Sequence, residues 1–394
     1  MKTNLIKTVA GTFLGAALLA ALPAVRATKK LAENESPKPT QTQPEAEKRP
    51  IVQLAILLDT SGSMEGLIEQ AKGQLWKIVN EFISAKQNGK IPEVQVALFE
   101  YGKSSLPASE GFIRMIQPLT TDLDKISEEL FALKTNGGDE YCGWVIQEAV
   151  KRLTWSDSPD VYRAIFIAGN EPFTQGQVNY SDACKAAIGK GIVVNTIHCG
   201  GNEEGLRTKW RDGAVLADGK FMNIDQNQAV VHIAAPQDAA ITRLSEELNS
   251  TYLAFGERAE ESLVRQEAQD ANAKLLAPQG ASVSRALVKA SANYRNSSWD
   301  LVDAVKENKV ELEKLKKDEL PKEMQELSVK EREAFIQKKS AERAQLQTKI
   351  NDLNKQRTKF VAEQSKTAAS TNTLDAAIVT AVREQAAKRN YKFE

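Results

Sequence analysis

The amino-acid sequence predicts an α/β fold with a mostly parallel sheet covered by helices on both faces, followed by an all-α, partly coiled-coil region. From Ile51 to about residue 257, short apolar runs rich in β-branched residues alternate with longer amphipathic segments. Such alternation is typical of a parallel sheet. Residues 258–394 are rich in Ala, Glu, Lys, Gln and Arg and have no recognisable strand. In a parallel sheet, ligands bind at the carboxyl ends of the strands, near a switch in strand order.

The composition is that of a globular protein with a high content of charged residues. A chain of 394 residues can form two or three domains, and 42% of its residues are apolar while 26% are charged. Basic and acidic residues are equal at 52 each. Net electrostatic attraction to nucleic acids or acidic membranes is therefore excluded as a basis for function.

The first 27 residues have the layout of a secretory signal peptide. Lys2 and Lys7 precede an apolar stretch from Val9 to Val25, and Ala27 completes a small-residue cleavage site. We therefore predict an exported protein, either periplasmic or extracellular. The alternative is an uncleaved N-terminal anchor that tethers the chain to the membrane, although the apolar stretch is at the short end for a span.

Residues 28–50 predict a disordered linker. Four prolines stand among Glu, Gln, Lys and Thr with no aromatic residue, at Pro37, Pro39, Pro44 and Pro50. Such a segment cannot bury enough apolar surface to fold, so it is expected to act as a stiff tether.

The predicted α/β region, residues 51–257, begins with a buried strand. Its apolar run ends at Asp59, and after the turn residue Gly62 an amphipathic pattern predicts a helix over residues 67–83. Further β-rich runs predict strands at 94–101, 111–119 (an edge strand), 162–168, 192–198 and 220–224. Helical spacing of apolar residues predicts helices at 123–133, 141–155, 182–190, through Trp210, and at 237–249.

The C-terminal region, residues 258–394, is expected to form several helices. Pro321 and the stretch 294–299 break it into segments that pack as hairpins. Apolar residues at alternating four- and three-residue steps predict a short coiled-coil-like seam formed by Leu346, Ile350, Leu353 and Phe360, with Arg357 at one position. A self-contained helical bundle is favoured over an intermolecular coiled coil.

The three cysteines allow two interpretations. In an exported chain, Cys184 and Cys199 are plausible disulfide partners, which leaves Cys142 over. Alternatively all three are small buried apolar residues.

The residues with the clearest chemistry follow the first strand. Asp59, Ser61 and Ser63 form an Asp-x-Ser-x-Ser motif on a tight loop between a buried strand and a helix. One carboxylate and two hydroxyl oxygens on a rigid turn are ligands that suit Mg2+. Two later loops are expected at the same edge of the sheet: residues 135–140 precede a helix, and residues 168–172 follow a strand.

These three loops make residues 51 to about 255 resemble a von Willebrand factor type A (VWA) domain with its metal-ion-dependent adhesion site (MIDAS). The resemblance implies a Rossmann-like sheet that binds Mg2+ or Mn2+ at its top, with a carboxylate of a protein or cell-surface partner completing the coordination. It implies that Ser61 and Ser63 are direct ligands and that Asp59 binds directly or through water. Asp139 then stands where the family has threonine, and Asn170 stands where it has a second aspartate.

The two departures conserve the charge of the site. Asp59 and Asp139 supply two carboxylates, as in the family, so a cation remains plausible, but we expect a weaker or rewired site whose partner depends less on donating an acid. Glu140 and Glu171 are candidates for a supporting role around the ligands, with solvated acids as the alternative. Asp139 also fits an N-terminal helix cap.

An enzymatic function is not predicted. The chain has two histidines, His198 and His232, and no Walker phosphate loop or zinc-type Cys/His cluster. A serine hydrolase using Ser61 or Ser63 would lack the Gly-x-Ser-x-Gly elbow. We therefore expect metal-dependent binding without catalysis. The alternative is an envelope scaffold with a degenerate metal site that binds through its helical tail.

Overall fold

The computed structural model describes residues 49–394, apart from 66–67, 70–77, 79–80, 83–84, 225–232, 276–279, 368–373 and 394. The predicted signal peptide and nearly all of the predicted linker lie outside the described residues, as does His232. Most of the predicted helix over residues 67–83 also lies outside them, but its described apolar residues Ile68, Ile78 and Phe82 are buried.

The central sheet has six strands in the order β4-β3-β1-β5-β6-β7. Their bounds are Ile51–Asp59 (β1), Glu93–Tyr101 (β3), Ile113–Thr120 (β4), Tyr162–Gly169 (β5), Val193–Cys199 (β6) and Phe221–Ile224 (β7). All neighbours are parallel except β4, which pairs antiparallel with β3 at the edge. The predicted mostly parallel sheet and its edge strand are therefore confirmed. Strand order switches at β1, because its neighbours β3 and β5 lie on opposite sides.

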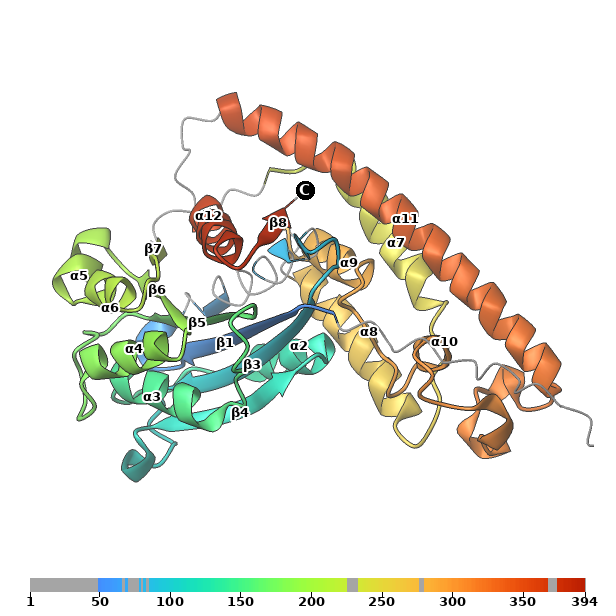
Figure 1. Cartoon of the computed structure of the whole chain (residues 1–394), viewed down its shortest axis with the longest axis horizontal. Helices are drawn as coiled ribbons and strands as arrows, with labels where there is room; N and C mark the ends of the chain where they lie inside the picture. The colour runs from blue at the N-terminus through green and yellow to red at the C-terminus, as the bar shows by residue number, and fades with distance from the viewer. Residues whose placement is uncertain are drawn as a thin grey trace, which may run out of the picture. The chain divides into compact units, whose positions relative to one another are not determined.

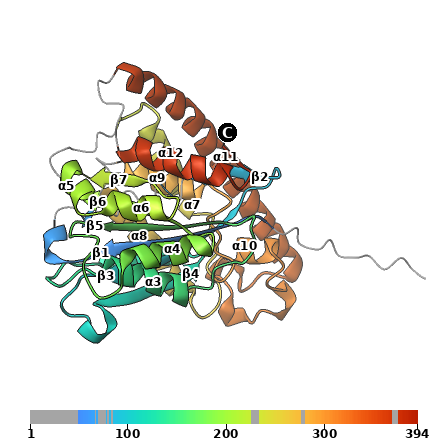
Figure 2. The ribbon, with the colours of Figure 1, turned by 60° about the vertical axis from the view of Figure 1, so that its left-hand side comes forward.

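Helices cover both faces of the sheet, because the strands are apolar on both faces. Along β1, Leu54, Ile56 and Leu58 enter one core, whereas Ala55 and Leu57 enter the other. The second core is closed by helices α3 (Cys142–Arg152), α4 (Tyr180–Gly189) and α6 (Trp210–Leu216). The first is closed by α2 (Leu123–Ala132), α7 (Asp238–Asn249) and helices of the C-terminal region (Figure 2).

The predicted helix through Trp210 is two helices in the structure. The chain forms α5 (Asn202–Arg207) and then α6, and Lys209 between them has a positive φ of 74°. A left-handed residue cannot continue a right-handed helix, so the two segments change direction there.

The C-terminal region consists mainly of helices, as predicted: α8 (Ala259–Leu275), α9 (Ala281–Lys289), α10 (Leu301–Lys306), α11 (Val329–Thr367) and α12 (Leu374–Ala387). The predicted absence of a strand is wrong, because β8 (Tyr391–Phe393) pairs antiparallel with β2 (Ala85–Gln87). Buried Tyr391 packs edge-on against Phe82 and donates a hydrogen bond to the Ile51 carbonyl at 2.9 Å.

The predicted coiled-coil seam packs within the chain. Helix α11 lies along α7 (Figure 1), with Ile350 fully buried and Leu346 and Leu353 partly buried in the first core. Arg357, which interrupts the apolar spacing, forms an ion pair of 2.7 Å with Asp238 of α7. The seam therefore belongs to a bundle within the chain.

Residues Lys48–Glu394 form one compact unit, because the C-terminal helices share the first core with the sheet. Val283, Trp299 and Ile378 are buried in the same cluster as the residues of β1. The boundary predicted near residue 257 stays a prediction.

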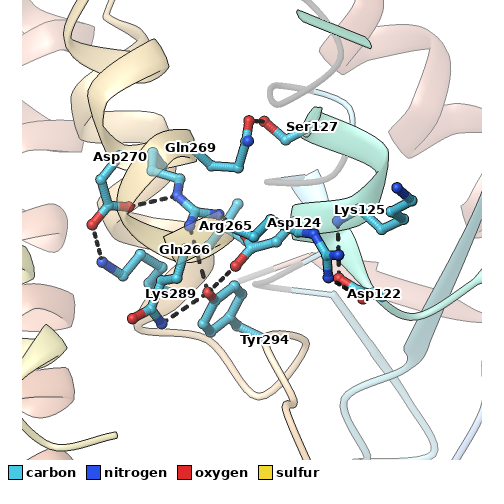
Figure 3. A network of polar contacts seen from close by, with 12 residues as sticks. Asp122, Asp124, Lys125, Ser127, Arg265, Gln266, Gln269, Asp270, Lys289 and Tyr294 are labelled. Carbon is cyan, nitrogen blue, oxygen red and sulfur yellow. Dashed lines mark hydrogen bonds and ion pairs between the residues drawn. The ribbon is translucent and has the colours of Figure 1, made fainter. Parts of the chain in front are cut away.

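A buried polar network joins α2 to the C-terminal helices (Figure 3). Arg285 of α9 pairs with Asp124 of α2 and, at 2.9 Å, with Asp270 of α8. Tyr294 donates its hydroxyl to Asp124, and the ammonium of Lys289 lies 2.7 Å from Asp270. The network thus places opposite charges together where water is excluded.

None of the helices in the described part of the chain combines the length and the apolar character needed to cross a membrane.

Candidate metal centre

Asp59 is the last residue of β1 and lies at the carboxyl edge of the sheet, beside the switch in strand order. Its side chain is fully buried, and its Oδ1 accepts a hydrogen bond of 2.7 Å from the Ser61 amide. The hydroxyls of Ser61 and Ser63 share a hydrogen bond of 2.8 Å. The Ser63 hydroxyl donates to Asn170 Oδ1 at 3.0 Å. The structure therefore brings together Asp59, Ser61, Ser63 and Asn170.

The loop after β1 takes this form because its backbone is tied on both sides. The Thr60 amide donates to the Tyr101 carbonyl at 2.9 Å, and the Asn136 amide donates to the Thr60 carbonyl at 2.9 Å. Ser61 then precedes a short 3-10 turn, Gly62–Met64, whose Met64 side chain is fully buried. The two serines are consequently held by the sheet on one side and by the loop of residues 135–140 on the other.

The Asp59 carboxylate has no compensating positive charge among the described residues. Burial raises the pKa of Asp59 to about 7, the nearby Glu171 raises it further, and the Ser61 amide opposes this shift. Its second oxygen, Oδ2, is buried without a hydrogen-bond partner. A buried carboxylate without a counter-charge is costly, and a bound cation would reduce that cost.

Glu140 is the second acidic side chain at this place. It is 4% exposed, and its Oε2 is also buried without a partner. A Cβ atom added to Gly102 would lie 2.6 Å from Glu140 Cγ and 2.7 Å from Asp59 Oδ1. Glu140 and Asp59 therefore pack against the same backbone position, which has no room for a side chain larger than that of glycine.

Asp139 points elsewhere. Its side chain is exposed, and its carboxylate accepts a hydrogen bond of 3.2 Å from the Tyr141 hydroxyl. The expected helix cap is not formed by Asp139, because the residue before α3 is Tyr141 and no side chain caps this helix. The predicted role of Asp139 as a ligand stays a prediction.

Glu100 lies close to this edge, but its charge is already neutralised. Its carboxylate is 2.5 Å from the Arg114 guanidinium and 3.8 Å from the Lys103 ammonium, and the Thr60 hydroxyl donates to it. Glu100 therefore differs from Asp59 and Glu140, which have no ion pair with a described basic side chain.

The donor set fits a hard divalent cation. Carboxylate, hydroxyl and amide oxygens are the ligands that Mg2+ and Mn2+ prefer. Within the described ranges no three His, Cys, Asp or Glu side chains gather as a metal-binding group, so the neutral oxygens are needed to complete this set. Asp59, Ser61, Ser63, Asn170 and Glu140 are the residues that could hold such an ion.

Among the described residues, His198 forms no hydrogen bond with Ser61 or Ser63. His198 is fully buried, and neither ring nitrogen has a hydrogen-bond partner. Burial lowers its pKa, and its ring packs against Trp210 at 5.6 Å. His198 therefore acts as a packing residue and pairs with neither serine.

The cysteines are free thiols. Cys142, Cys184 and Cys199 are all buried, and burial raises the pKa of each thiol. The suggested Cys184–Cys199 disulfide is not formed, which leaves the interpretation as small buried residues.

Compared by sequence, the chain matches no protein-family profile and no curated protein. Compared by structure, it is similar to the conserved hypothetical protein BatB from Bacteroides thetaiotaomicron, with 19% identity and a TM-score of 0.34 over 44% of this chain and 90% of that one. The SpRpn10 VWA domain is 16% identical, with a TM-score of 0.34 over 45% of this chain and 89% of that one.

Proximal thread matrix protein 1 from the mussel byssus, solved with a zinc-occupied MIDAS motif, is 14% identical with a TM-score of 0.34. The match covers 46% of this chain and 43% of the mussel protein. These values assign neither a family nor a function, so the function is inferred from the residues at the carboxyl edge of the sheet.

Proposed function

We propose that residues 51–257 form a VWA domain that binds Mg2+ or Mn2+ and, through the metal, a protein or cell-surface partner, without catalysis. One observation carries this proposal: two buried carboxylate oxygens, Asp59 Oδ2 and Glu140 Oε2, have no partner, and both side chains pack against Gly102 near Ser61. Buried polar atoms in folded proteins are normally satisfied, so two orphaned anionic oxygens at one place favour a cation.

In this proposal each residue of the site has its own role in binding the cation. Asp59 supplies charge and orients Ser61 through the amide bond to its carboxylate. Ser61 and Ser63 supply hydroxyl oxygens, and Asn170 supplies an amide oxygen from the end of the adjacent strand. An acid of the loop 135–140 supplies the second charge. An oxygen atom of the partner would complete the set of ligands around a cation held by these residues.

We propose further that the protein is exported, as residues 1–27 indicate, and meets its partner in the periplasm or outside the cell. A divalent cation present at millimolar concentration outside the cytoplasm can occupy even a site of low affinity.

The test is a titration of Mg2+ and Mn2+ into the metal-stripped full chain, read as melting temperature. A ligand bound only by the folded state stabilises it by about 3 kcal/mol at a hundred times its Kd, which raises the melting temperature by several degrees. We expect this rise in the wild type and not in Asp59→Asn, which keeps the size of the side chain. Asp352→Asn, on an exposed part of α11, is the matched control and should respond as the wild type does.

If millimolar metal does not shift the wild type, metal-dependent binding is refuted. The scaffold that binds through its helical C-terminal region would then be the better explanation.

A further inference from the structure

We infer that Glu140, and not Asp139, is the second charged ligand of the metal, and that the partner therefore presents a neutral oxygen, such as a hydroxyl or an amide carbonyl, in place of a carboxylate. This inference rests on the proposed function and adds to it the chemistry of the partner.

The first step is the direction of two neighbouring side chains. Glu140 is buried, and its Cγ and Asp59 Oδ1 both pack closely against Gly102. Asp139 points outward to the Tyr141 hydroxyl. Glu140 is buried and Asp139 is exposed, so of the two acids only Glu140 faces the interior beside Asp59.

The second step is that the backbone fixes this choice. The Glu140 amide donates to Gln175 Oε1 at 2.8 Å, and the Ser104 amide donates to the Gly137 carbonyl at 2.5 Å. A Cβ on Gly138 would lie 2.5 Å from the Gly102 carbonyl oxygen, so the loop packs closely against the backbone there. Rotating the segment to turn Asp139 inward would break these contacts.

The third step is the balance of charge. Asp59 and Glu140 together carry two negative charges, which one divalent cation neutralises. The remaining donors, Ser61, Ser63 and Asn170, are neutral, and the charge of Glu100 is matched by Arg114. A carboxylate from a partner would compete with the Glu140 carboxylate for a place on the cation, whereas a hydroxyl or an amide oxygen would not.

The experiment is a titration of the metal-stripped full chain with Mn2+, with free Mn2+ measured by electron paramagnetic resonance. Glu140→Gln and Asp139→Asn are a matched pair, because each removes one charge from adjacent residues with little change in volume. We expect Glu140→Gln to weaken Mn2+ binding roughly tenfold or more, and Asp139→Asn to change it less than about twofold.

Acetate at constant ionic strength is the probe for the partner's chemistry. We expect acetate to leave Mn2+ affinity of the wild type unchanged and to restore much of the affinity lost in Glu140→Gln, where it can take the vacated position. Acetate that tightens Mn2+ binding to the wild type as much as to Glu140→Gln would overturn the inference about the partner.

The outcomes separate the two proposals. If Mn2+ binds the wild type but depends on Asp139 and not on Glu140, the inference is wrong and the proposed function stands. If the wild type binds no Mn2+, both are wrong. Should Glu140→Gln fail to fold by circular dichroism, Glu140→Asp keeps the charge but withdraws it by one methylene group, and it must also weaken Mn2+ binding.

Discussion

The buried ion pairs of Arg285 with Asp124 and Asp270 allow a stringent test of how the C-terminal helices are joined to the sheet. Arg285 is 2% exposed and Asp124 is 4% exposed. In Arg285→Met, Asp124 would keep only the Tyr294 hydroxyl as a described partner from this network, and its charge would remain buried. Removing one member of a buried ion pair costs about 3–5 kcal/mol, so we expect Arg285→Met to lower the free energy of unfolding by that amount.

Urea unfolding of the full chain, followed by tryptophan fluorescence and circular dichroism, measures this loss. The control is Arg243→Met on α7, because Arg243 is exposed and lies 3.7 Å from Glu247 in a surface pair. Such a pair contributes less than about 1 kcal/mol. The double variant Asp124→Leu/Arg285→Met should recover most of the loss, since it leaves no unpaired charge at Asp124 and Asp270 keeps Lys289. A loss below about 1 kcal/mol in Arg285→Met, or a double variant no better than the single one, would refute the reasoning.

Two further predictions concern the metal site and the same polar network. Gly102→Ala would place a Cβ 2.7 Å from Asp59 Oδ1 in a residue whose φ is 80°. We expect backbone strain to lower the free energy of unfolding by about 1–2 kcal/mol, and Mg2+ to cause no rise in melting temperature. A rise equal to that of the wild type would contradict this. Burial lowers the pKa of Lys289 from 10.5 to about 8. The unfolded chain therefore binds more protons than the folded one between these two values, and this lysine makes stability rise with pH through that window. Between pH 7.5 and pH 10 this lysine should raise the free energy of unfolding of the wild type by up to about 3 kcal/mol, and Lys289→Met should not show this rise. Urea unfolding at both pH values measures the difference, and an equal pH dependence in both proteins would contradict the assignment.

The sheet could be predicted from the sequence because its strands are buried on both faces. The eight residues of β5 are all buried and are apolar apart from Arg163, and such a run can be recognised without knowledge of the neighbouring strands. The short strands β2 and β8 gave no such signal. Each has three residues, and their pairing joins positions about 300 residues apart, so neither periodicity nor local turn chemistry reveals it.

The candidate site was predictable down to the loop but not to the side chain. The first motif places Asp59, Ser61 and Ser63 by short-range geometry, because the strand ends at Asp59 and the turn follows directly. Counting along the next loop favours Asp139. Which of the two adjacent acids faces inward depends on contacts with Gly102 and Gln175. Both residues are remote in sequence, so these contacts could not be predicted from the local sequence pattern.

The buried acids at this edge of the sheet are of two kinds: one is neutralised by basic side chains of the chain, and the others have no such counter-charge. Asp59 ends β1, Glu100 is the second-last residue of the neighbouring strand β3, and both are fully buried. For Glu100 the chain provides Arg114 and Lys103, so burial is compensated within the fold. For Asp59 and Glu140 the described residues provide no cation, and both side chains pack against the same glycine, Gly102. The fold neutralises Glu100 but provides no counter-charge for Asp59 and Glu140. The missing positive charge is therefore best supplied by a cation from solution, and a divalent ion would balance both carboxylates.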